Sequence, residues 1–184
     1  MPDRDAAAYY ADKLRQGEAY ERYVVARLCA EGVVIACHEG RQAQILLGDT
    51  TLGIEIKYDD RMVMTGNLYI EVAEKRRARQ EAWIPSGIRA SSSARWYGIG
   101  NYRDWWLFAR RRLCVAQAEH AILTIARGTS QGYLLPCDEA SALSCRRRHW
   151  PDRSAGGDPV DPVAARQAVG TAVFGLQYPL KEEG

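Results

Sequence analysis

The stretch Gly48-Asp49-Thr50-Thr51-Leu52-Gly53-Ile54-Glu55-Ile56-Lys57-Tyr58-Asp59-Asp60 decides how the rest of the chain is interpreted. From Ile54 onward apolar and charged side chains alternate, which is typical of a β-strand with one buried face. Glu55 and Lys57 therefore project from the same polar face, and Asp49 comes just before the strand. Two carboxylates and the main-chain carbonyl of Ile56 are oxygen ligands suited to Mg²⁺. The lysine beside them can orient a water or stabilise charge on a phosphate.

A long helix is predicted upstream, from about residue 5 to residue 31. Tyr20, Val24 and Leu28 recur at helical spacing, and Gly32 is a plausible end. Glu18 and Glu21 are three residues apart and share roughly one helix face. From this spacing alone, Glu21 is interpreted as a solvated helix carboxylate paired with Arg22 or a similar neighbour, and only the resemblance given next makes it a candidate for the same site.

This arrangement resembles the active site of the PD-(D/E)xK nuclease superfamily, in which an aspartate precedes a strand carrying Glu-x-Lys and a helix often adds a glutamate. The run 52–57, with Asp49 six residues before Glu55, is similar to the metal-binding strand of mismatch-repair nicking endonucleases. The run 17–22, Gly-Glu-Ala-Tyr-Glu-Arg, resembles the first helix of archaeal Holliday-junction resolvases. There the glutamate before the arginine is catalytic, and it matches Glu21.

The resemblance implies an α/β (α+β) fold of the restriction-endonuclease-like type, with a central mixed β-sheet flanked by helices. The expected order is α-β-β-β-β followed by C-terminal α/β additions, with strands at 33–37, 42–47, 52–58 and 68–72. Residues 1–150 are expected to form a single nuclease-like domain. Residues 151–184 read as a C-terminal extension with a loop rich in proline and glycine.

The same resemblance implies a Mg²⁺-dependent endodeoxyribonuclease that hydrolyses phosphodiester bonds, with Mn²⁺ able to substitute. Its expected catalytic residues are Glu21, Asp49, Glu55 and Lys57, and its metal ligands are Asp49, Glu55, the Ile56 carbonyl and Glu21. Lys57 would orient the attacking water. The substrate would be a branched DNA or a repair or recombination intermediate. The competing hypothesis is a catalytically inactive nucleic-acid-binding module with the same fold.

The position of Asp49 has two interpretations. Most members of the superfamily have Pro-Asp and a longer gap before the glutamate, whereas this chain has Gly48-Asp49. If 41–47 and 51–58 formed a tight hairpin, Asp49 would lie at its tip, roughly 20 Å from Glu55. Gln42 or Gln44 would then face Glu55. We favour Asp49 as the ligand because the mismatch-repair pattern has the short spacing.

Charge is distributed unevenly along the chain. Residues 1–60 carry 7 basic and 11 acidic groups, residues 61–150 carry 15 and 7, and residues 151–184 carry 3 and 5, so the net charges are −4, +8 and −2. An acidic segment that holds a cation and a basic segment that holds phosphates suit a nuclease. The alternative is that the arginines only solvate surface helices. The residues expected to contact DNA are Lys75, Arg76, Arg77, Arg79, Arg110, Arg111 and Arg112.

The remaining sequence features exclude other classes. No P-loop or dinucleotide-binding glycine pattern is present, and the three histidines lack the spacing of a nucleophile–base pair. Five cysteines without close pairing argue against a disulfide framework or a zinc cluster. No apolar run reaches the ~18 residues of a membrane helix, and the N-terminus lacks a signal-peptide pattern. A cytoplasmic protein with DNA as partner is expected, a homodimer is an open alternative, and no membrane association is expected.

Overall fold

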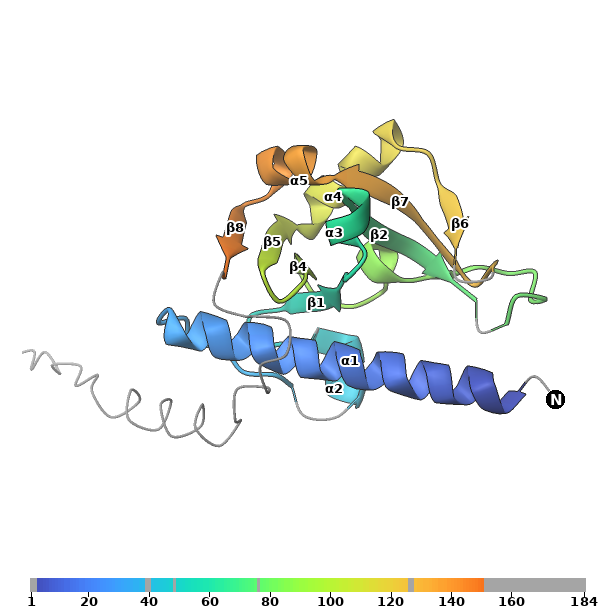
Figure 1. The fold of residues 1–184 in the computed structure, drawn as a ribbon, viewed down its shortest axis with the longest axis horizontal. Helices are drawn as coiled ribbons and strands as arrows, with labels where there is room; N and C mark the ends of the chain where they lie inside the picture. The colour runs from blue at the N-terminus through green and yellow to red at the C-terminus, as the bar shows by residue number, and fades with distance from the viewer. Residues whose placement is uncertain (1–2, 39–40, 48, 76, 126–127, 151–184) are drawn as a thin grey trace, which may run out of the picture.

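The computed structural model describes residues 3–38, 41–47, 49–75, 77–125 and 128–150, and Figure 1 shows their arrangement. The C-terminal extension predicted at 151–184 lies outside the described residues. Within them the protein is mixed α/β, as predicted, with two four-stranded sheets.

The first element is the long helix α1 (Asp3–Ala30), which confirms the predicted N-terminal helix. Tyr20, Val24 and Leu28 are buried along one face, at the spacing of an amphipathic helix. The helix ends before Gly32, which has a φ of 85° and so adopts a left-handed conformation that favours glycine.

The first sheet has the strand order β1-β4-β5-β8. It contains β1 (Ile54–Tyr58), β4 (Trp96–Gly100), β5 (Asp104–Ala109) and β8 (Arg146–His149). β1 and β4 are parallel, and the other pairs are antiparallel. Gly98 in β4 leaves room for the indole of Trp105, because a Cβ there would lie 2.6 Å from the ring. β1 is an edge strand, so one of its sides has no partner among the described strands.

The second sheet is antiparallel with the order β3-β2-β7-β6. It contains β2 (Asn67–Glu74), β3 (Ile84–Pro85), β6 (Leu123–Ile125) and β7 (Ser130–Pro136). Short helices connect the strands: α3 (Met62–Thr65), α4 (Arg110–Ala116), α5 (Cys137–Leu143), and the 3₁₀ helices η1 (Gly87–Arg89) and η2 (Gln117–Glu119).

Two apolar clusters place the first sheet in the middle of the molecule. One cluster joins α1 to Ile54 and Ile56 of β1 and to Trp105. The other joins Tyr97 and Ile99 of β4 to buried residues of β2 and β7. In Figure 1, α1 runs along one side of β1 and the second sheet lies on the other side. The second of these clusters, between the two sheets, is called the inner cluster below. Because side chains alternate along a strand, the charged face of β1 turns toward the inner cluster.

Two of the predicted strands are wrong. The segment 41–47 forms the helix α2 (Arg41–Leu47), because its glutamines, leucines and alanine favour a helix. The strand prediction failed because seven residues are too few to distinguish a helical repeat of apolar side chains from the two-residue repeat of a strand. The segment 33–37 is an irregular stretch with one isolated bridge, between Cys37 and Thr50. The predicted order α-β-β-β-β is therefore wrong as well. The strands at 54–58 and 67–74 are confirmed.

Within the described ranges, no helix combines the length and the apolarity needed to cross a membrane. The longest, α1, is 28 residues long, but charged residues occur along its whole length.

Candidate active site at the edge of β1

Asp49 lies beside the middle of β1. Its Oδ2 accepts a hydrogen bond of 2.6 Å from the main-chain N–H of Ile56. A tight turn makes this possible: Gly53 donates its N–H to the carbonyl of Thr50 and has a φ of 64°. The buried Thr50 hydroxyl accepts the N–H of Ile54. The turn folds Asp49 back along the strand. The short spacing between Asp49 and Glu55 is therefore sufficient to bring the aspartate to β1.

The hairpin alternative is excluded by the same region. Gln44 lies on α2 rather than on a strand paired with β1. Its side-chain amide donates a hydrogen bond of 3.4 Å to the carbonyl of His38. Gln44 therefore supports the loop before α2, and Asp49 is the residue that the turn brings to β1.

Glu55 and Lys57 form an ion pair on the inner face of β1. The Nζ of Lys57 lies 3.1 Å from Oε1 of Glu55, and the side chains are 42% and 10% exposed. The other carboxylate oxygen, Oε2, is buried and has no hydrogen-bond partner among the described residues. The sequence predicts one buried face of β1 and therefore a solvated polar face. It is covered instead, because β4 places Tyr97 and Ile99 next to it in the inner cluster.

Glu21 approaches from α1, on the opposite face of β1. Burial and the nearby carboxylate of Asp49 raise the pKa of Glu21 to about 7. Burial also raises the pKa of Asp49, although Lys57 and the Ile56 N–H oppose the shift. Burial alone would lower the pKa of Lys57, but the carboxylates of Glu55 and Asp49 outweigh it and hold that pKa above its usual value.

The structure therefore brings all four predicted catalytic residues to one edge of β1. Glu55 and Lys57 come from the inner face, Glu21 from the helix face, and Asp49 from the turn between them. Among the described residues, no three His, Cys, Asp or Glu side chains are close enough to enclose a metal ion by themselves. A metal here would also need main-chain, water or substrate oxygens, which is common for Mg²⁺.

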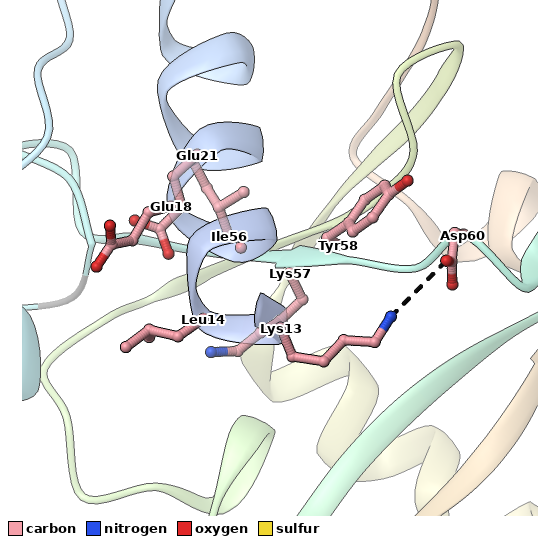
Figure 2. Close-up of a pocket in the computed structure, with 9 residues that line it drawn as sticks. Lys13, Leu14, Glu18, Glu21, Ile56, Lys57, Tyr58 and Asp60 are labelled. Atoms are coloured by element: carbon pink, nitrogen blue, oxygen red, sulfur yellow. Dashed lines mark ion pairs between the residues drawn. The ribbon is translucent and has the colours of Figure 1, made fainter. Parts of the chain in front are cut away.

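A groove of about 330 Å³ opens beside this edge, between α1 and β1 (Figure 2). Both Glu21 and Lys57 line it, together with Lys13, Leu14, Gly17, Glu18, Ile56, Tyr58 and Asp60. Figure 2 shows Lys13 reaching from the helix toward Asp60, just beyond the end of β1. Their charged atoms are 3.9 Å apart, and both side chains are about half exposed.

Sequence reasoning missed two neighbours of the site. Burial, followed by the charges of Glu21 and Asp49, raises the pKa of the Cys37 thiol to about 11. His38, the next residue in the chain, opposes the rise in the pKa of Asp49 that burial causes. The main-chain N–H of His38 also donates to the carbonyl of Asp49. Nothing in the sequence indicates these neighbours, because the apolar run 33–37 predicts a separate strand.

Two other carboxylates near the site have structural partners. Asp59 accepts the main-chain N–H groups of Arg61 and Met62, at the start of α3, and of Tyr69 in β2. It therefore joins β1 to the next elements. Glu71 in β2 accepts hydrogen bonds from the hydroxyl groups of Ser86 and Ser130.

The predicted DNA-contacting residues fall into two groups. Arg77 and Arg79 are exposed, Lys75 has its Nζ 4.3 Å from the centre of the Trp83 ring, and Arg76 lies outside the described residues. Arg110 is different, because its guanidinium donates to the carbonyls of 88, 90, 92 and 94 and to a serine hydroxyl. Arg110 thus holds the segment before β4, and its hydrogen-bond donors are engaged within the protein.

The other two arginines of that triplet differ from Arg110. Arg111 is exposed, whereas Arg112 donates a hydrogen bond of 3.1 Å to the carbonyl of Leu143, at the end of α5. Within the described part of the chain, Arg111 is therefore the member of the triplet whose charge is open to solvent without such an anchor.

No family model matches the chain, and no curated protein or solved structure is significantly similar to it. The assignment of a function therefore rests on the site geometry and the sequence.

Proposed function

We propose that the protein is a Mg²⁺-dependent endodeoxyribonuclease related to the PD-(D/E)xK superfamily. The observation that carries the proposal is the meeting of Glu21, Asp49, Glu55 and Lys57 at the edge of β1 that pairs with no other described strand. These four groups come from a helix, a turn and a strand, so their meeting is a property of the fold and not of one segment. The helix followed by Asp and Glu-x-Lys on an edge strand also supports relationship to this superfamily.

The oxygen atoms proposed for this site are of the kind that a magnesium ion prefers. Asp49, Glu55 and the Ile56 carbonyl would hold it, with Glu21 as a further ligand and Mn²⁺ as a substitute. The buried Oε2 of Glu55 supports this assignment, because a carboxylate oxygen that is shielded from water and unpaired is costly. Mg²⁺ prefers few carboxylates together with water and phosphate oxygens. When bound, Mg²⁺ would neutralise charge on the scissile phosphate.

The protein's own groups would perform the remaining tasks. Lys57 is held by Glu55 and stays protonated, so it can orient the attacking water and stabilise charge that develops on the phosphate. Glu21 has a pKa of about 7, so it can hold or release a proton at neutral pH. The basic segment 61–150, with its net charge of +8, would attract the DNA backbone.

A nucleic-acid-binding module without cleavage is the second candidate. One observation favours it: no three metal-binding side chains converge among the described residues. This candidate predicts DNA binding that does not depend on divalent metal and no hydrolysis. The same experiment separates the two.

That experiment is nicking of supercoiled plasmid DNA. We expect cleavage with Mg²⁺ or Mn²⁺, none in excess EDTA, and binding without turnover in Ca²⁺. The variant Lys57→Ala should not cleave but should still bind DNA. Undiminished cleavage in EDTA would rule out the metal-dependent mechanism. Cleavage by Lys57→Ala at the wild-type rate would rule out this site as the catalytic centre. DNA binding with no cleavage under any metal would favour the binding module.

A further inference from the structure

The groove between α1 and β1 contains a glycine that the local structure does not require. Gly17 lies within α1, where glycine costs helix stability relative to alanine. Its backbone has no left-handed φ, and a Cβ there would meet no atom of the described residues within 4 Å. Neither backbone geometry nor a close neighbour in that part of the chain accounts for it. Gly17 does line the groove, so its missing side chain keeps this part of the groove open.

The other groove residues offer contacts of two kinds. Leu14 is 64% exposed and, with the ring of Tyr58, provides an apolar surface of the kind on which a base can rest. Lys13 provides a cation. Its ion pair with Asp60 is long and exposed, and such pairs contribute little. A phosphate can therefore replace Asp60 on Lys13 at small cost.

The groove contains both carboxylates and cations. Glu18 is paired with Arg22 at 3.5 Å, whereas Asp60 competes with the ligand for Lys13. The groove also contains Lys57. An anionic ligand seated there would therefore lie directly beside the proposed catalytic edge.

We propose that this groove binds one unpaired nucleotide of the DNA, next to the scissile bond, with its phosphate on Lys13. The inference rests on the proposed function and names its substrate class: DNA in which a strand leaves the duplex. The volume of about 330 Å³ lies at the small end of the ~300–1,000 Å³ typical of ligand pockets. A space of this size suits a single nucleotide better than a stacked base pair, which favours an unpaired strand as the occupant.

The test compares two fluorescein-labelled DNAs in Ca²⁺: a duplex with an unpaired single-stranded extension and the same duplex with blunt ends. The variant Gly17→Leu should lower the affinity for the extended DNA by about tenfold and leave that for the blunt duplex within about twofold. Leucine favours helix, so the variant keeps its fold. Ala19→Leu, at an exposed position of α1 that does not line the groove, is the matched control and should change neither affinity.

Two charge variants test the phosphate contact. Lys13→Gln should weaken binding of the extended DNA selectively, whereas Asp60→Asn should strengthen it, because Lys13 is then released. Arg15→Gln, an exposed cation of the same helix paired with Asp12, is the control for general charge. Equal losses for both DNAs with Gly17→Leu, or equal effects of Lys13→Gln and Arg15→Gln, would overturn the inference. Because binding is measured without turnover, a lack of plasmid nicking would contradict only the proposed function.

Discussion

The main-chain N–H of Ile56 lies 2.6 Å from Oδ2 of Asp49, so the aspartate is held by the strand that carries Glu55 and Lys57. A substitution at 49 therefore affects a hydrogen bond as well as a possible metal ligand. The two effects can be separated by choosing substitutions that keep or remove the hydrogen-bond acceptor.

Asp49→Asn keeps an oxygen acceptor for the Ile56 N–H and removes the negative charge. It should change the free energy of unfolding by less than about 0.5 kcal/mol, whereas Asp49→Ala should lower it by about 1–2 kcal/mol because the N–H loses its partner. Both variants should lose the Mg²⁺ binding heat in titration calorimetry. Gln44→Ala should keep that heat, and its loss there would mean that Gln44 and not Asp49 completes the site.

Lys57→Ala should destabilise the protein, contrary to the expectation for a solvated strand face. It leaves the carboxylate of Glu55, which is 10% exposed, without its cation. The expected loss in denaturant unfolding is about 1–3 kcal/mol, below the cost for a fully buried pair because the lysine is 42% exposed. The double variant Glu55→Gln/Lys57→Met should recover part of the loss. Lys13→Ala, which breaks an exposed pair, is the control and should change stability by less than about 0.5 kcal/mol.

Glu21 should make stability depend on pH. Its pKa in the folded protein is about 7, above the ordinary value of 4.5, so the folded state keeps a proton that the unfolded state releases between these values. Stability should therefore fall as the pH rises from about 4.5 to 7. Glu21→Gln should remove this slope and stabilise the protein at about pH 8, by about 1–2 kcal/mol after allowance for partial exposure. At about pH 4, melting of the two proteins should coincide. A slope that persists in Glu21→Gln would assign the titration to Asp49, whose pKa is also raised.

The basic run after β2 should contribute to the salt dependence of DNA binding. Replacing Lys75, Arg76, Arg77 and Arg79 together by alanine should flatten the plot of log affinity against log salt, by up to about one unit per lost phosphate contact. Arg110→Ala should behave differently, because Arg110 donates to several carbonyls of 88–94. It should lower the melting temperature and leave the slope unchanged. An unchanged slope in the fourfold variant would place the phosphate contacts elsewhere, with Arg111 as the next residue to test.

The local patterns of the sequence were enough to predict α1, β1 and β2. The Glu-x-Lys spacing and the aspartate before it also identified the residues that meet at the edge of β1. The sequence could not show that Glu55 is buried, because the layer that covers it comes from β4 and the second sheet, far along the chain. The sequence could not distinguish α2 from a strand, because the apolar and polar residues of this seven-residue segment fit the repeat of a helix as well as that of a strand. Arg110 could not be distinguished from Arg111, since only the folded segment 88–94 supplies its acceptors.

The helix α1 is unevenly supported along its length. Tyr20, Val24 and Leu28 anchor its second half in the core, but residues 11–19 are exposed except for Gln16 and Gly17, which are half-buried. An isolated helix of that length is marginal in water. Amide hydrogens near Gly17 should therefore exchange with solvent much faster than those near Val24, by local opening from the N-terminal side. One wall of the groove then opens more readily than the half of the helix that is anchored in the core, and bound DNA should slow exchange there before it changes exchange anywhere in the core.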